Sequence, residues 1–163
     1  MLALIAVTLA IHDAEEYFAF PLFLSSLGGQ LSKWLPAPAL QHSVSNLHIA
    51  LILATVLPGT FIVWAIVSKR QWLFIAALLV EAVLLVNAFF HIFAAVLRGA
   101  YVPGLITAAL INLPFGLYVF QRAVRDRWIR SSAAWQLIAV AVVVHVLWLS
   151  SAFLFARSPI PCG

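Results

Sequence analysis

Five long apolar stretches, separated by short segments rich in charge or turn residues, dominate this 163-residue sequence. A helix needs about 20 mostly apolar residues to cross the ~30 Å hydrocarbon core of a bilayer, and each stretch is near that length. Hydrophobic residues make up 65% of the chain and charged residues only 9%, so too little polar surface exists to cover a globule in water. The pattern predicts an all-α integral membrane bundle of five transmembrane helices, covering residues 2–27, 47–67, 72–97, 102–120 and 133–156.

Turn residues and charges mark the ends of these helices. Gly28-Gly29 opens the longest loop, Lys69-Arg70 separates the second helix from the third, and Arg98-Gly99 ends the third. A chain of this length is expected to form one domain, so residues 1–163 are interpreted as a single transmembrane helical domain. Because no basic segment precedes the first apolar stretch, we expect a retained helix rather than a signal peptide.

Basic residues are divided unevenly between the two sides of the bundle. The loops after the second and fourth helices hold Lys69, Arg70, Arg122, Arg125, Arg127 and Arg130. The opposite side holds Lys33, Arg98 and Arg157. The positive-inside rule therefore predicts a cytoplasmic N-terminus and an external C-terminus, in the inner (cytoplasmic) membrane of the cell. The net charge of +4 forms no basic face, so nucleic acid is not an expected partner.

The segment His12-Asp13-Ala14-Glu15-Glu16 places three acids and a histidine near the middle of the first helix. Residues three and four apart are neighbours on a helix, so Glu15 and Glu16 flank His12 one turn along, and Asp13 points elsewhere. A charged side chain at mid-bilayer costs about 2.5–3.5 kcal/mol on insertion scales. One interpretation is a buried polar knot that ties helices together. A functional site is favoured, because ionisable residues inside membranes usually mark one.

Later helices offer further polar side chains. Asn87 and His91 are four residues apart on the third helix, with Arg98 between them in helical projection. Asn112 and His145 lie near mid-depth in the fourth and fifth helices. The remaining candidates are Glu81, deeper in the third helix, Tyr101 in the turn after it, His42 in the first loop, and His48 at the start of the second helix.

The buried acids outnumber the fixed cations near the spans, where only Arg98 faces Asp13, Glu15, Glu16 and Glu81. Carboxylates in such surroundings must gain a proton, pair with a charged histidine, or bind a metal. Each of these outcomes indicates a different function, and the sequence leaves all three open.

Three motifs occur in order along the chain, namely His12-x-x-Glu15-Glu16, Asn87-x-x-x-His91 and Tyr101-x-Pro103-Gly104-x-x-Thr107. Together they resemble the HXXEE family of small bacterial membrane proteins, from the first helix through the fourth. The resemblance implies that His12, Glu15, Glu16, Asn87 and His91 are signature residues. It implies no particular activity.

The predicted function is that of a membrane-embedded enzyme acting on a lipid or isoprenoid-like molecule. Histidine and carboxylate ligands suit Zn or Fe. The expected ligands are His12, Glu15, Glu16, His91 and His145, and the expected catalytic residues are Glu15, Glu16, Asn87, Asn112, Tyr101 and Arg98. A metal-free version uses a buried glutamate as acid and a histidine as base.

A proton-coupled carrier or channel is the competing function, since chains of Glu, His and Asn suit proton relays. The odd number of helices, the small size and the lack of an internal repeat count against it, although a homo-oligomer would remove the objection of size. A third interpretation is an accessory subunit that binds a partner's helix. The sequence contains no P-loop and no G-x-G-x-x-G motif, so nucleotide chemistry is not indicated.

Overall fold

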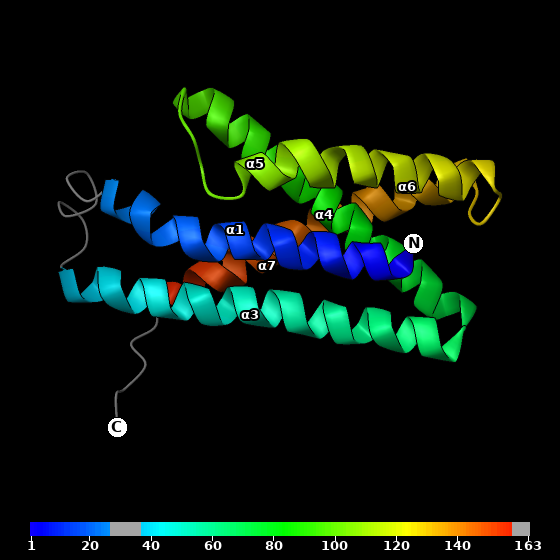
Figure 1. The fold of residues 1–163 in the computed structure, drawn as a ribbon, viewed down its shortest axis with the longest axis horizontal. Coiled ribbons are helices and arrows are strands. Elements are labelled where there is room, and N and C mark those ends of the chain that lie inside the picture. The colour runs from blue at the N-terminus through cyan, green and yellow to red at the C-terminus, as the bar shows by residue number, and fades with distance from the viewer. Residues whose placement is uncertain (27–36, 158–163) are drawn as a thin grey trace.

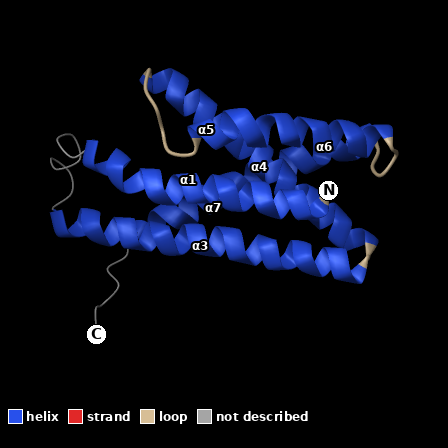
Figure 2. Ribbon diagram, viewed as in Figure 1, coloured by secondary structure: helices blue, strands red, loops and turns tan. Residues whose placement is uncertain are grey.

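The computed structural model describes residues 1–26 and 37–157, and these residues form a bundle of long helices (Figure 1). The helices are α1 (Leu2–Ser26), α3 (Ala37–Ser68), α4 (Gln71–Arg98), a fourth segment over Leu105–Arg125, and α7 (Ser131–Arg157). Figure 2 shows helices and loops and no strand in the described part of the chain. The predicted all-α class is confirmed.

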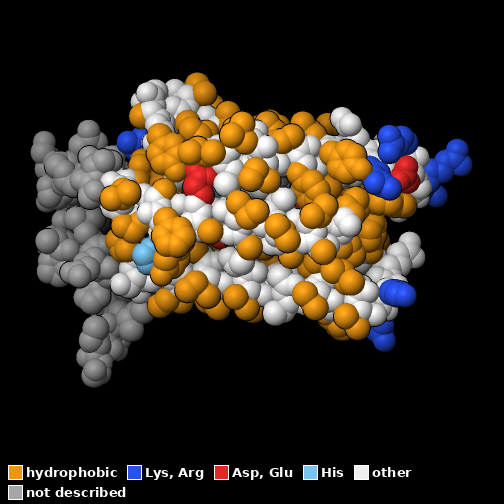
Figure 3. Space-filling view, viewed as in Figure 1, with side chains coloured by type: hydrophobic (Ala, Val, Ile, Leu, Met, Phe, Trp, Pro, Cys, Tyr) orange, Lys and Arg blue, Asp and Glu red, His pale blue; other side chains and the backbone are white. Residues whose placement is uncertain are grey.

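Four helices are long and apolar enough to cross a membrane, namely Val44–Ser68, Gln71–Arg98, Leu105–Arg125 and Ser131–Ser151. The chain is therefore a multi-pass membrane protein. α1 has 25 residues but includes Asp13, Glu15 and Glu16, and its crossing of the membrane stays a prediction. Figure 3 shows hydrophobic side chains around the middle of the bundle and most Lys and Arg gathered at one end.

Two helix starts differ from the predicted ones by three residues or more, and the fourth segment ends at Arg125 rather than at 120. α3 begins at Ala37, ten residues before the predicted start at 47, because Pro38 falls in the first turn, where a missing N–H costs no hydrogen bond. The prediction that His42 lies in a loop was therefore wrong, since its backbone is helical. The fourth segment begins at Leu105 rather than at 102, because the chain turns at Gly104 with a φ of +83°.

The fourth segment is not a uniform α-helix. It consists of α5 (Leu105–Thr107), a π-helical turn η1 (Ala108–Asn112) and α6 (Leu113–Arg125). The Leu113 N–H bonds to the Ala108 carbonyl, five residues back, and Pro114 then has no N–H to donate. Such a turn holds an extra residue and changes which side chains face inward. Thr107, Asn112 and Gly116 are all buried as a result.

α4 lies at the centre of the bundle and contacts each of the other helices. Its inward faces carry small or branched apolar side chains, including Leu73, Ala77, Leu78 and Ala82, which are fully buried. Small residues let neighbouring helices approach closely, which is the main source of packing energy in lipid. This packing brings Asn87 and His91 of α4 to the polar segment of α1.

Candidate functional site

Three side chains from two helices, His12 and Glu16 of α1 and His91 of α4, meet inside the bundle; we call them the His–Glu trio. Glu16 Oε1 is 2.8 Å from Nε2 of His91 and 3.7 Å from Nε2 of His12. The two imidazole rings stand edge to face, with their centroids 5.0 Å apart. The His12 side chain is fully buried, whereas those of His91 and Glu16 are 16% and 17% exposed. The trio is thus enclosed on one side and accessible on the other.

Hydrogen bonds fix the orientation of the His12 ring. Thr107 Oγ1 donates to Glu15 Oε2 at 2.6 Å, so this hydroxyl accepts from His12 Nδ1, 2.8 Å away. In the neutral ring the proton then lies on Nδ1, and the lone pair lies on Nε2, the nitrogen on the side of Glu16. The side-chain amide of Asn87 reaches this Nε2 at 2.6 Å, with Nδ2 donating.

Glu15 ties α1 to the start of α5. Its Oε1 accepts from the Tyr101 hydroxyl at 2.7 Å and from the Ile106 N–H at 3.1 Å. Its Oε2 accepts from the Thr107 N–H at 2.7 Å as well as from the Thr107 hydroxyl. The first N–H groups of a helix lack partners within it, and no side chain at the α5 N-cap supplies one. Glu15 supplies that cap from another helix, and both of its oxygens are occupied there rather than at the trio.

Tyr101 lies in the turn between α4 and α5, outside the spans, and is 43% exposed. Burial of its hydroxyl, then the hydrogen bond to Glu15 and the negative charges of Glu15 and Glu16, raise the pKa of Tyr101 to about 12. The phenol therefore stays protonated at neutral pH and continues to donate to Glu15.

Gly104 allows residues 101–107 to approach the trio. Its φ of +83° is a conformation that favours glycine. A Cβ at this position would lie 2.9 Å from Cε1 of His12 and 2.9 Å from Cε1 of His91, closer than any side chain tolerates. The motif that begins at Tyr101 is explained in this way: its tyrosine and threonine bond to Glu15, and its glycine leaves room for both imidazole rings.

The trio has a donor set that suits a metal ion. One ligand atom from each residue lies within 4.8 Å of the others. Two ligands of a tetrahedral zinc ion are about 3.4 Å apart, so the most widely separated pair would close by up to about 1.4 Å around an ion. Two histidines and one carboxylate occur in catalytic zinc sites with an open position and in non-haem iron sites. Thr107 provides the outer hydrogen bond that would orient His12 as a ligand. The Nδ2 of Asn87 contacts the Nε2 of His12 that would bind an ion, so this amide must turn away or present its oxygen to the ion.

Three other predicted site residues are not bonded to the trio. His145, buried on α7, has its ring 4.8 Å from that of Phe90, and its Nε2 has no hydrogen-bond partner among the described residues. Arg98, at the end of α4, lies over the ring of Phe23 at 4.5 Å. Asn112 is buried in η1, and neither of its amide atoms has a partner in the described part. His145 does not belong to the group whose ligand atoms converge, and its role as a ligand stays a prediction.

Asp13 and His48 connect α1 to α3 instead. Asp13 is buried and accepts a hydrogen bond from the Thr55 hydroxyl at 2.6 Å. The His48 ring stacks on Tyr17 with 3.9 Å between centroids, and its Nε2 is 3.0 Å from the Tyr17 carbonyl oxygen. The interpretation as a polar knot between helices therefore fits Asp13. The side chain of His42 lies outside the described residues.

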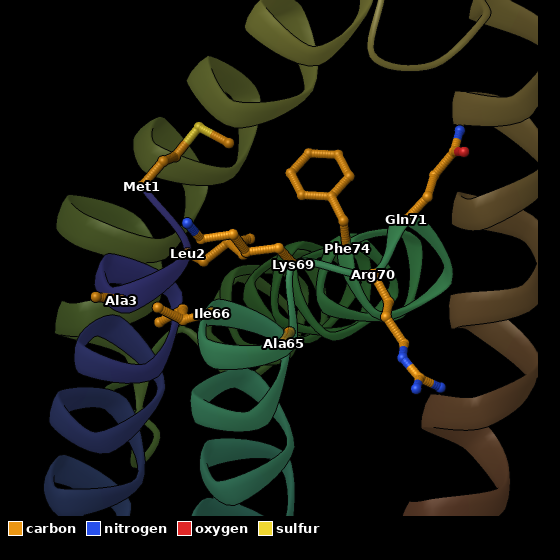
Figure 4. A pocket seen from close by; sticks show the side chains of 9 residues that line it. All are labelled: Met1, Leu2, Ala3, Ala65, Ile66, Lys69, Arg70, Gln71 and Phe74. Atoms are coloured by element: carbon orange, nitrogen blue, oxygen red, sulfur yellow. The ribbon is translucent and has the colours of Figure 1, made fainter.

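A groove of about 500 Å³ lies at the other end of the bundle, where α1, α3 and α4 meet (Figure 4). Its wall is mostly apolar, and Lys69 and Arg70 of the α3–α4 turn stand beside it. It contains no histidine and no acid, so it shares no chemistry with the trio.

Two threonines form hydrogen bonds with the polar side chains of α1, although neither was among the predicted ligands and catalytic residues. Thr107 bonds to both His12 and Glu15, and its position at the end of the Tyr101 motif is the signal that identifies it. Thr55 of α3 bonds to Asp13 of α1, which is 42 residues away in the sequence. A single threonine in an apolar helix gives no comparable signal.

A family described as "Protein of unknown function with HXXEE motif" matches residues 3–119, which is well over half of the chain. The resemblance predicted from the motifs is thereby confirmed. The matched residues include the whole His–Glu trio, Glu15, Asn87 and the segment from Tyr101 to Thr107. No curated protein and no solved structure matches the chain.

Proposed function

The chain belongs to the HXXEE family, and we propose that it is a membrane-embedded enzyme that acts on a lipid or isoprenoid-like molecule at the His–Glu trio. The observation that carries the proposal is the convergence of His12, Glu16 and His91 between helices whose other inward residues are mainly apolar. Ionisable groups are rarely retained in such surroundings without a function.

The exposure of the trio supports a lipophilic substrate. His91 and Glu16 are partly exposed, and Tyr101 and Ile106 beside Glu15 are 43% and 55% exposed. The surface around the middle of the bundle is predominantly hydrophobic (Figure 3). A molecule that reaches the trio from the bilayer would need an apolar body and a small polar group to meet the two histidines and the carboxylate.

We assign the trio as the ligands of a zinc or iron ion. When bound, such an ion supplies a Lewis acid that polarises an oxygen of the substrate. Thr107 holds the His12 ring with Nε2 toward Glu16, where an ion would bind, and Glu15 holds Thr107. Asn87, freed from Nε2, would orient the polar group of the substrate. Glu15 and Tyr101 thus act as positioning residues rather than as ligands.

A metal-free enzyme is the closest alternative, and the contact between Asn87 and the His12 lone pair favours it. In this version Glu16 and His91, 2.8 Å apart, exchange a proton with the substrate as acid and base. The same residues are required, but no metal is bound.

A proton-coupled carrier would need polar groups that continue to the basic end of the bundle. Leu78, Val119 and Ala123, all fully buried, instead form an apolar cluster at that end, together with Phe74, Ile129 and Leu137. The described side chains therefore support an enzyme over a carrier.

The distribution of charge supports a location in the inner membrane with a cytoplasmic N-terminus. α1 starts at the end of the bundle where Lys69, Arg70 and the basic residues between α6 and α7 gather (Figures 1 and 3). Positive residues are retained on the cytoplasmic side of membrane proteins.

Elemental analysis of the purified protein by mass spectrometry tests the metal site. We expect near-stoichiometric zinc or iron in the wild type and its loss in His12→Ala and His91→Ala. His48→Ala is the matched control, because it removes a histidine that contacts Tyr17 rather than the trio, and it should keep the metal. A wild type without metal, even after supplementation, would overturn the metal assignment and leave the acid–base version.

A further inference from the structure

Glu81 of α4 is a fully buried carboxyl group without a polar partner. Its exposed fraction is 0%, and neither oxygen has a hydrogen-bond partner among the described residues. Its neighbours on α4 are apolar, and on α6 it faces Gly116, where a Cβ would lie 3.0 Å from Glu81 Oε1. The glycine therefore leaves room for the carboxyl group, although no group on α6 bonds to it.

Asn112 is a second buried polar residue without a partner among the described residues, and it lies one helical turn before Gly116. Its exposed fraction is 1%, and both of its amide atoms lack partners in the described part of the chain. Residues one turn apart have Cβ atoms about 5–6 Å from each other, so Glu81 Oε1 lies within roughly 9 Å of the Asn112 Cβ. The two polar groups, which have no partner among the described residues, therefore lie in the same region of the buried interface between α4 and the fourth segment.

The surroundings of this pair are closed on one side. Beyond Gly116, toward the basic end, Val119 and Ala123 pack against Leu78 in a fully buried apolar cluster. In the other direction along the same helix comes Thr107, which bonds to His12 and Glu15. The π-helical turn places Asn112 between Thr107 and Gly116 on the inward face. Along the fourth segment, the polar connection from Glu81 therefore leads through Asn112 and Thr107 toward the trio.

Physical chemistry limits the state of such a pair. An ionised carboxylate without a partner in an apolar interior is far too costly, and an unpaired amide also costs free energy. Buried waters that make two to four hydrogen bonds are the usual solution when the site is polar. A neutral carboxylic acid can donate one hydrogen bond and accept others, which matches a bridging water.

We propose that Glu81 and Asn112 form a second polar site, which binds water and holds Glu81 as a neutral carboxylic acid. The site opens toward the trio and is closed toward the basic end. The Glu81 proton passes to the bound water and returns, so that the site exchanges protons with the side of the bundle that contains the trio. Use of that proton in catalysis rests on the proposed function, whereas the water and the neutral acid do not.

Infrared spectroscopy of the purified protein, in a detergent that contains no ester carbonyl, tests this proposal. The difference spectrum between the wild type and Glu81→Gln should contain the carbonyl stretch of a neutral carboxylic acid, because other buried acids such as Asp13 contribute equally to both spectra. On transfer to D₂O, the band should shift without unfolding, because water reaches the site. Asn112→Leu should slow that shift by about tenfold, the order of rate change that corresponds to one lost hydrogen bond.

Thr55→Val is the matched control, since it removes a hydroxyl that bonds to Asp13 between α1 and α3, and it should leave the exchange rate unchanged. A difference spectrum without this band would overturn the neutral acid. A Glu81 band that does not shift in the folded protein, or that exchanges equally fast in Asn112→Leu, would overturn the water site. Metal content measured on the same Glu81→Gln sample should equal that of the wild type, so failure of the proposed metal site would be recognised separately.

Discussion

Glu15 and Glu81 are two glutamates in long helices of the same bundle, yet their surroundings are opposite. Glu15 accepts hydrogen bonds from Tyr101, Ile106 and Thr107 at the start of a helix. Glu81 has no partner among the described residues and packs against Gly116. A carboxylate is stabilised by the N–H groups and the dipole of a helix N-terminus, whereas an apolar surface favours only the neutral acid. The structural role of an acid in this bundle therefore depends on whether it meets a helix N-terminus or the apolar side of a helix.

The largest effect is expected where the Glu15 region is most crowded. Gly104→Ala should destabilise the protein by about 2–5 kcal/mol, because it adds strain at positive φ to a clash with two imidazole rings. Thermal unfolding in detergent measures the loss, and metal content should fall with it. Gly99→Ala is the control, since Gly99 also has a positive φ of +62° but open space around it. An equal loss in both variants would show that the approach to the rings has no energetic importance.

The next effect tests the cap itself. Glu15→Ala should cost about 2–4 kcal/mol, because it leaves the Ile106 and Thr107 N–H groups without partners. Hydrogen exchange at these two amides should become faster. Glu16→Gln alters the adjacent acid, which has no contact with these amides, and should leave their exchange unchanged while lowering metal content. Unchanged protection in Glu15→Ala would contradict the role of Glu15 as a cap.

The Glu81 region should respond in the opposite direction. Glu81→Leu should change the free energy of unfolding by no more than about 1 kcal/mol or increase it, because it replaces a buried polar group that has no partner in the described part of the protein and displaces the water bound to it. Chemical or thermal unfolding compared with Glu15→Leu measures the contrast. Comparable destabilisation by the two leucine substitutions would mean that Glu81 has a strong partner in the folded protein.

The smallest effect concerns Tyr101. Tyr101→Phe should cost about 0.5–1 kcal/mol, the value of one partly exposed hydrogen bond. The pKa of Tyr101 is raised from 10.0 to about 12, so the hydroxyl stabilises the fold below pH 10 and this contribution is lost as the pH rises toward 12. Stability measured across this range should decline in the wild type, and the decline should be smaller in Tyr101→Phe. Identical pH profiles would rule out the bond to Glu15 as its source.

Much of the fold could be predicted because a bilayer imposes simple rules on a sequence. Apolar length and turn residues located the helices, and the errors in their starts fell where proline or glycine acts locally, at Pro38 and Gly104. The π-helical turn was not predictable from hydropathy, since both helix types are equally apolar. The predicted ligands His12, Glu16 and His91 converge. For His145 the sequence indicated a depth in the bundle but not the direction in which the side chain points, so its role stays a prediction.

The sequence by itself determined that the chain is a helical membrane protein with an unusually polar first helix. A chain with 65% hydrophobic residues has too little polar surface to cover a globule in water. It also identified the family residues. Only the tertiary structure decided which partners each of these residues contacts. His12 meets Asn87 and Thr107 across 75 and 95 residues of sequence, respectively. Which of two adjacent glutamates caps a helix and which one joins the histidines depends on how α1 packs against α4 and α5, and packing over such separations is not written in local spacing.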